Sequence, residues 1–253
     1  MMAIIGVPIN SKTAYVLDKF LKNQEDIQKN SVISVFTVFA TEEVEFAEKL
    51  RNMLAKHNLK ADVITFSINK PKNARDRIWN IVAARNAIRE YFLKSEAEYL
   101  IFMDADMIFD PSIVNKLVER AKKGYDVVYN GYLDKDGHGI NLTGFGGTLI
   151  KRWVMEKVFF KCKERKERVV DEGVFFELDL FRARARVFRG FLVYSEHYGE
   201  NVSVSHPREL TFRERVRHSP YFRIPIHALS VLLCYDILRK AKDIFSNLKS
   251  AFV

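Results

Sequence analysis

One stretch of the chain, from Tyr99 to Pro111, constrains the fold and the chemistry more than any other. It reads Tyr-Leu-Ile-Phe-Met-Asp-Ala-Asp-Met-Ile-Phe-Asp-Pro. Its first five residues form an uninterrupted apolar run, which is typical of a strand buried on both faces. The run ends at two carboxylates one residue apart, Asp104 and Asp106. Such a strand places acidic side chains at the edge of an α/β sheet where ligands bind.

The carboxylate pair itself indicates a cation. Two carboxylates this close repel each other, so a positive partner between them is favoured. Hard oxygen ligands suit Mg²⁺ or Mn²⁺, which usually keep positions open for the phosphates of a substrate. Alternatively, the two aspartates only begin a turn and cap the helix expected near Pro111, because Asp is common in both places.

The rest of the chain predicts the sheet to which this strand belongs. Further apolar strands are expected at residues 3–7, 32–39, 61–66 and 125–129, with helices at 11–22, 41–57, 71–93 and 111–122. This alternation predicts an α/β fold with a mostly parallel, doubly wound sheet flanked by helices. A later helix, beginning near Glu172, is expected to end at Gly190 before a strand at 191–194. We expect residues 1–206 to form this domain and residues 207–253 to form a C-terminal helical extension.

Composition limits the class of protein. Apolar residues make up 48% of the chain, which predicts a folded protein and not a disordered one. Cys162 and Cys234 lie far apart, so they predict neither a disulfide framework nor a zinc site, and we expect a cytoplasmic protein. The formal net charge of +9 favours anionic partners such as nucleotides, phospholipid surfaces or nucleic acid.

Three segments together resemble the GT-A glycosyltransferases, particularly the large family 2. Asp104-Ala105-Asp106 after its buried strand resembles the Asp-x-Asp motif of that family, which holds the divalent ion that bridges the donor's diphosphate. Upstream, Ala-Ala-Arg-Asn-Ala-Ile at residues 83–88 resembles the family's helix with its Ala-Arg-Asn segment. Downstream, Gly-Gly-Thr-Leu-Ile-Lys-Arg at residues 146–152 resembles the Gly-Gly segment before the acceptor-side helix.

The resemblance implies a GT-A, Rossmann-like fold and an enzyme that moves a sugar from a UDP- or GDP-sugar to an acceptor hydroxyl. The acceptor would be a glycan or a lipid-linked sugar, and Mn²⁺ or Mg²⁺ would be the cofactor. The metal ligands it implies are Asp104, Asp106 and His206, with His197 as the alternative histidine. The donor contacts it implies are Pro8, Asn10, Arg85, Asp104, Gly146 and Gly147. From the residues alone, Pro8 and Asn10 are ordinary turn residues.

Two carboxylates remain open as the base that the family uses to activate the acceptor hydroxyl. The family commonly has Glu-Asp here, whereas Gly173 follows Glu172 in this chain. Glu172 would stand at a helix N-terminus and point into the cleft, and Glu177 would lie a turn inside. Spacing to Gly190 favours Glu177, but we favour Glu172. A base on the opposite face of the sugar would invert the anomeric centre.

Two other functions would also explain part of this pattern. Phosphatases of the haloacid dehalogenase type also place Asp-x-Asp after a buried strand, but usually on the first strand of the sheet. Here three strand–helix units precede the motif. A basic nucleic-acid-binding protein is the other alternative, but no RNA-recognition, helix-turn-helix or zinc-finger pattern occurs. We therefore expect no nucleic acid partner.

The end of the chain predicts an amphipathic helix. Its apolar residues recur at helical spacing, while basic residues lie mostly off that stripe. The stripe comprises Leu238, Ala241, Ile244, Phe245, Leu248 and Phe252, and the basic residues are Arg239, Lys240, Lys242 and Lys249. Two outcomes stay open: the helix packs on its own domain or a second copy, or it lies in a membrane interface.

Overall fold

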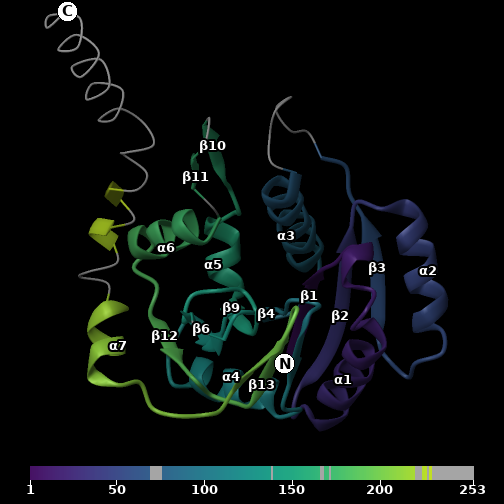
Figure 1. The fold of residues 1–253 in the computed structure, drawn as a ribbon, viewed down its shortest axis with the longest axis horizontal. Coiled ribbons are helices and arrows are strands. Elements are labelled where there is room, and N and C mark those ends of the chain that lie inside the picture. Colours follow the sequence, from purple (N-terminus) through teal and green to yellow (C-terminus); the bar gives the residue numbers. More distant parts are fainter. Residues whose placement is uncertain are drawn as a thin grey trace, which may run out of the picture.

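A computed structural model describes residues 1–68, 76–137, 139–165, 168–170, 172–219, 224–226 and 228–229. A seven-stranded sheet forms the centre, in the order β12-β6-β9-β4-β1-β2-β3 (Figure 1). The strands are β1 (Met2–Pro8), β2 (Ser34–Thr41), β3 (Ala61–Thr65), β4 (Tyr99–Phe102), β6 (Val127–Asn130), β9 (Thr148–Lys151) and β12 (Val187–Gly190). All neighbours are parallel except β9, which is antiparallel to β4 and β6. The expectation of a mostly parallel α/β sheet is confirmed.

The sheet buries two separate apolar cores because alternate residues of each strand face opposite sides. On β1, Ala3, Ile5 and Val7 belong to one core, whereas Ile4 belongs to the other. The first core is covered by α1 (Leu17–Asn30), α2 (Val44–Leu54) and α4 (Ile113–Lys122). The second is covered by α3 (Asp76–Lys94), α5 (Arg152–Lys157) and α6 (Glu172–Arg182).

Short strands form three smaller sheets in addition to the central one. Strand β5 (Met107–Phe109) directly follows the two aspartates and joins a three-stranded antiparallel sheet, β14-β13-β5. Strands β13 (Ser195–Tyr198) and β14 (Val202–Ser205) complete it. The hairpins are β7 (Tyr132–Leu133) with β8 (Ile140–Asn141), and β10 (Lys163–Arg165) with β11 (Arg168–Val170).

Three expected elements have different bounds in the structure. The first helix does not start at Ser11: a 3-10 turn, Ser11–Thr13, comes first, and α1 continues to Asn30. The turn is capped by Asn10, whose side chain accepts from the Lys12 N–H at 3.1 Å. The later helix ends at Arg182 and not at Gly190, because the chain turns at Arg184, whose φ is 55°, and enters β12. The strand expected at 191–194 is therefore displaced to Val187–Gly190.

The C-terminal region is described only in part. Helix α7 (Phe212–Arg217) begins with a capping box between Thr211 and Glu214. The amphipathic stripe expected from Leu238 to Phe252 lies outside the described residues. Among the described helices, none is both long and apolar enough to cross a membrane.

Candidate active site

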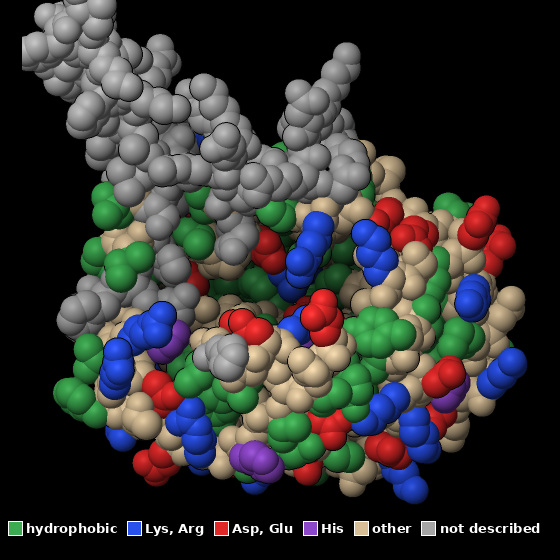
Figure 2. Space-filling model, in the orientation of Figure 1, with side chains coloured by type: hydrophobic (Ala, Val, Ile, Leu, Met, Phe, Trp, Pro, Cys, Tyr) green, Lys and Arg blue, Asp and Glu red, His purple; other side chains and the backbone are tan. Residues whose placement is uncertain are grey.

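The candidate site lies where β1, β4 and β6 end, on the side of the sheet that carries α3 and α6. Figure 2 shows this face hollowed, with acidic and basic side chains gathered around the hollow. Strand β4 stops at Phe102, so the chain leaves the sheet just before Asp104. The N–H of Met103 still donates to the Gly6 carbonyl of β1 at 3.1 Å. The register with β1 therefore fixes where the carboxylate motif emerges.

Arg85 of α3 joins Asp104 to Glu172. One guanidinium nitrogen lies 3.4 Å from Asp104 Oδ1, and the other forms an ion pair with Glu172 Oε1. The guanidinium carbon sits 4.3 Å from the centre of the Phe145 ring. Arg85 is only 5% exposed, and its buried Nε has no hydrogen-bond partner among the described residues. The packing holds the arginine rigidly between the aspartate motif and the N-terminus of α6.

Asp106 has two cationic or ionisable neighbours. Lys135 Nζ forms an ion pair with Asp106 Oδ2, and His197 Nε2 lies 3.7 Å from Oδ1. His197 Nδ1 lies 3.1 Å from the Leu133 carbonyl, to which it donates as the tautomer that leaves Nε2 free. A histidine that donates one nitrogen to a carbonyl presents the other as a metal ligand in many proteins. His197, the alternative histidine ligand, therefore lies beside Asp106.

The structure does not bring His206 to the aspartates. Residue Ser205 pairs with Ser195, so His206 falls opposite Tyr194, whose ring lies 5.4 Å away. Asp106, in contrast, accepts at its carbonyl from the Tyr198 N–H at 2.8 Å. Tyr194 and Tyr198 are four residues apart, so His206 and Asp106 lie about 13 Å apart along the strand direction. His206 is also exposed.

Glu177 does not face the hollow. It is 3% exposed, accepts from the Tyr129 hydroxyl at 2.9 Å and pairs with Arg189. Spacing to Gly190 favours Glu177 as the base. In the structure, however, its side chain is buried beneath α6 and does not reach the cleft. Glu172 is the first residue of α6 and lies at the cleft with Arg85. The geometry therefore separates the two carboxylates into one candidate base and one buried structural group.

The four remaining donor candidates lie in two pairs. Pro8 ends β1, and Asn10 caps the turn that follows. Gly146 packs so closely on Asp104 and Met107 that an added Cβ would lie 3.2 Å from Asp104 Oδ2 and still closer to Met107 Sδ. Gly147 has φ 88° and donates its N–H to the Phe102 carbonyl at 2.9 Å. Both glycines are therefore required by the turn that brings β9 beside β4.

Electrostatics around Asp104 favour a cation. Burial raises the pKa of Asp104, the negative charge of Asp106 raises it further, and Arg85 opposes both. A divalent ion would stabilise the ionised forms of both aspartates. Among the described residues, no three His, Cys, Asp or Glu side chains gather closely enough to form a metal cluster. The carboxylates of Asp104 and Asp106 nevertheless fit Mn²⁺ or Mg²⁺ in kind, because oxygen ligands suit both ions, and the neutral imidazole nitrogen of His197 could add a further ligand to Mn²⁺.

Sequence reasoning missed Lys135 and Arg189. Lys135 lies in the polar turn between β7 and β8, where nothing in the pattern marks it apart from the other charged residues. Arg189 is expected in the helix that ends at Gly190, but it lies on β12. Its ion pair with Glu177 therefore could not be predicted from the sequence.

The fold and the site define a class: a GT-A fold in which an Asp-x-Asp motif follows the fourth strand of a mostly parallel sheet. Residues 44–145 match the model of glycosyl transferase family 2, a stretch that covers less than half of the chain and includes the motif. Over this stretch the chain is similar to the family 2 glycosyltransferases, and its fold is that of the GT-A class. None of the curated proteins matches the sequence.

Solved structures agree with this fold. Mannosyltransferase PcManGT from Pyrobaculum calidifontis, in complex with GDP-Man and Mn²⁺, matches with a TM-score of 0.54 and 10% identity, over 100% of this chain and 80% of its own. TarS from S. aureus, in complex with UDP-GlcNAc, matches with a TM-score of 0.53 and 13% identity, over 91% of this chain and 66% of its own. At these identities the likeness shows the fold.

Proposed function

We propose that the protein transfers a sugar from a nucleotide-diphosphate donor to an acceptor hydroxyl with the help of Mn²⁺ or Mg²⁺. The observation that carries this proposal is the link, through Arg85, between Asp104 of the carboxylate motif and Glu172. Donor-side and acceptor-side groups of a transferase must lie a few ångströms apart, and here one arginine contacts both. The two similar structures hold UDP-GlcNAc and GDP-Man, which supports a UDP- or GDP-sugar donor.

Asp104, Asp106 and His197 are the residues that would hold the metal, with His197 in place of His206. When bound, the ion would neutralise charge on the departing diphosphate, the kind of electrostatic stabilisation that usually dominates such reactions. Pro8 and Asn10, at the end of β1, would line the nucleotide side of the hollow. Gly146 and Gly147 would let the donor approach the backbone closely.

Glu172 would accept the proton of the acceptor hydroxyl at Oε2, while Arg85 holds Oε1 and fixes the direction of the carboxylate. The attacking oxygen then forms the new bond to the anomeric carbon as the bond to the diphosphate breaks. Attack from the face opposite the leaving group inverts that carbon. We therefore propose an inverting transferase.

The charge of the described C-terminal residues supports a proposal for the acceptor and for where the enzyme meets it. Helix α7 carries Arg213, Arg215 and Arg217, and Phe212 at its start is 81% exposed. A basic surface with an exposed aromatic side chain suits an anionic membrane surface. We propose a cytoplasmic enzyme that meets a lipid-linked acceptor at the membrane, with a soluble glycan as the second candidate.

The direct test is Asp106→Asn, with Asp18→Asn as a matched control on the exposed first turn of α1. Thermal unfolding with Mn²⁺ and UDP- or GDP-sugars should show stabilisation of the wild type, about 2.7 kcal/mol at 100 times Kd. Asp106→Asn should lose this stabilisation and the release of free nucleotide, with an unchanged melting temperature in the absence of ligand. Equal stabilisation and equal turnover in both variants would remove the proposed metal site.

A further inference from the structure

Lys135 stands at the tip of the β7–β8 hairpin, and the backbone there is well fixed. The Asp134 N–H donates to the Gly139 carbonyl and the Gly137 N–H to the Asp134 carbonyl, each at 2.8 Å. Ser203 Oγ of β14 donates to the Lys135 carbonyl at 3.1 Å. Gly199 lies so close that a Cβ there would be 3.1 Å from the Lys135 Cβ. These contacts aim the lysine stem at the carboxylate motif.

The two ends of the Lys135–Asp106 pair differ in exposure. The Lys135 side chain is 44% exposed, whereas the Asp106 side chain is 14% exposed. The ammonium can therefore leave for solvent by rotating a flexible four-carbon stem. Asp106 has no such freedom, because its side chain is short and its backbone is held by β5, which begins at the next residue.

Arg85 provides the contrast on the other aspartate. It also neutralises a carboxylate of the motif, Asp104, but it is 5% exposed and pinned by Glu172 and the Phe145 ring. One aspartate thus has a fixed cation and the other a movable one. Without any cation, Asp104 and Asp106 would repel each other in a partly desolvated site.

We propose that Lys135 is a displaceable counter-ion of the metal site. It neutralises Asp106 while the site holds no metal, and a divalent cation drives it off as Asp106 becomes a ligand. The inference rests on the proposed function, because it takes Asp106 as a metal ligand. It adds that the protein has its own competitor for the metal, so that metal affinity is set partly by a residue that is not a ligand.

The first test is a Mn²⁺ titration of the nucleotide-free protein, followed by the electron paramagnetic resonance signal of free Mn²⁺. Lys135→Met, which keeps most of the stem, should bind Mn²⁺ about two- to fivefold more tightly, the range that partly exposed ion pairs give. The control is Lys19→Met, which removes the same charge from a lysine of α1 that pairs with Glu196. That variant should change the affinity less than Lys135→Met does.

The second test follows the displacement itself. Acetylation of lysine amines, read by mass spectrometry, should become faster at Lys135 when Mn²⁺ is added to the wild type. In Asp106→Asn, Lys135 should react fast with or without Mn²⁺. Lys19 should react at the same rate in all four samples.

The outcomes separate this inference from the proposed function. If Asp106→Asn loses Mn²⁺ binding but Lys135→Met binds Mn²⁺ like the wild type, the metal site stands and the counter-ion role is overturned. If Asp106→Asn binds Mn²⁺ like the wild type, the metal assignment itself fails and takes the inference with it. A tighter Lys135→Met together with Mn²⁺-dependent labelling of Lys135 supports both.

Discussion

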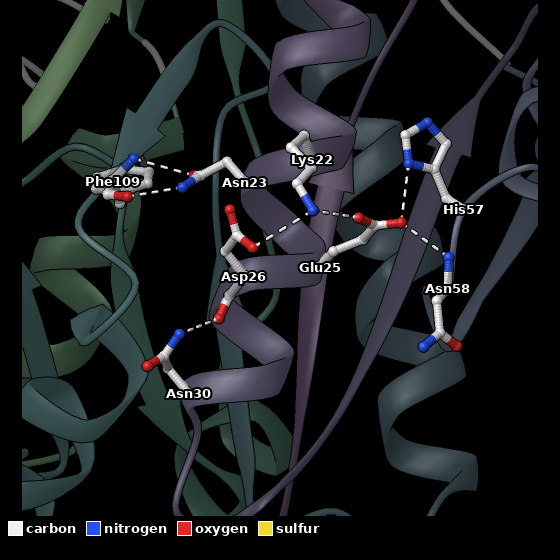
Figure 3. Close-up of polar contacts among 8 residues, drawn as sticks. All are labelled: Lys22, Asn23, Glu25, Asp26, Asn30, His57, Asn58 and Phe109. Carbon is white, nitrogen blue, oxygen red and sulfur yellow. Dashed lines mark hydrogen bonds and ion pairs between the residues drawn. The ribbon is translucent and has the colours of Figure 1, made fainter.

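At the scale of single residues, Asn23 shows how a polar side chain places the site. It lies in the middle of α1, where its Nδ2 donates to the Phe109 carbonyl at 2.7 Å and its Oδ1 accepts from the Phe109 N–H at 3.0 Å (Figure 3). The Asn23 amide thus makes the pair of hydrogen bonds with Phe109 that a neighbouring strand would make. Because β5 starts one residue after Asp106, this pair of bonds fixes the exit of the carboxylate motif.

Replacing Asn23 by Ala should lower the free energy of unfolding by about 2–4 kcal/mol, because a buried N–H and a buried carbonyl lose their partners. Urea unfolding followed by circular dichroism measures this. Asn30→Ala is the control: its amide donates to the Asp26 carbonyl on the exposed side of the same helix, at 2.8 Å. That change should cost less than about 0.5 kcal/mol. Equal losses of unfolding free energy in the two variants would show that the hydrogen bonds to Phe109 add no more stability than the exposed bond of Asn30.

The two candidate bases should separate cleanly in kinetics. Glu172→Gln should lower turnover by about 10²-fold or more with little change in donor affinity, because only proton removal is lost. Glu177→Gln should instead lower stability by about 3–5 kcal/mol, because Arg189 is left buried without its carboxylate. Steady-state rates and melting temperatures measured on both variants decide the assignment. Loss of turnover in a well-folded Glu177→Gln protein would reverse it.

At the scale of elements, a cluster between α1 and β13 ties the small sheet to the main domain. Glu196 accepts from Lys19 at 2.8 Å, from the Tyr198 hydroxyl at 2.6 Å and from the Tyr194 hydroxyl at 2.8 Å. The hydrogen bond from Lys19 is the largest cause that lowers the pKa of Glu196, to about 2, followed by that from Tyr198.

This pKa shift predicts a dependence of stability on pH. A carboxyl group whose pKa is lower in the folded state stabilises the fold fully above its ordinary pKa of 4.5. The contribution is lost as pH falls from there towards about 2. The difference in unfolding free energy between wild type and Glu196→Gln should therefore shrink between pH 5 and pH 3. Glu48→Gln, on the exposed face of α2, is the control. If the difference between wild type and Glu196→Gln stays constant over this pH range, the prediction is wrong.

Sequence patterns predicted the long buried strands well and the short strands poorly. The strands β1, β2 and β4 are apolar runs, so burial on two faces marks them directly. Strand β5 is only three residues long and is held by Asn23 and β13, contacts distant in the sequence. The same limit explains the choice between His197 and His206: both stand near strand ends, and only the register of β13 on β5 puts His197 beside Asp106.

At the scale of the whole molecule, the net charge of +9 and the C-terminal segment predict contact with anionic membranes. The protein with residues 1–253 should sediment with vesicles that contain anionic lipid, and the binding should weaken as salt is raised. Deletion of residues 237–253 should weaken the binding strongly and leave only the contribution of α7, and neutral vesicles should bind neither form. Equal sedimentation of both forms with anionic vesicles would leave the segment as a packing helix of the protein or of a dimer.

The position of β9 has a consequence for how the chain is assembled. This strand fills the place between β4 and β6 and is antiparallel to both, although it follows them in the sequence. Until residues 148–151 have left the ribosome, β4 keeps an open edge of unpaired backbone groups. Pairing between distant segments is slow because the intervening chain must first be ordered. A nascent chain that stalls before Thr148 therefore presents a ready site for aggregation or chaperone capture, and Asp104 and Asp106 reach their final positions late in synthesis.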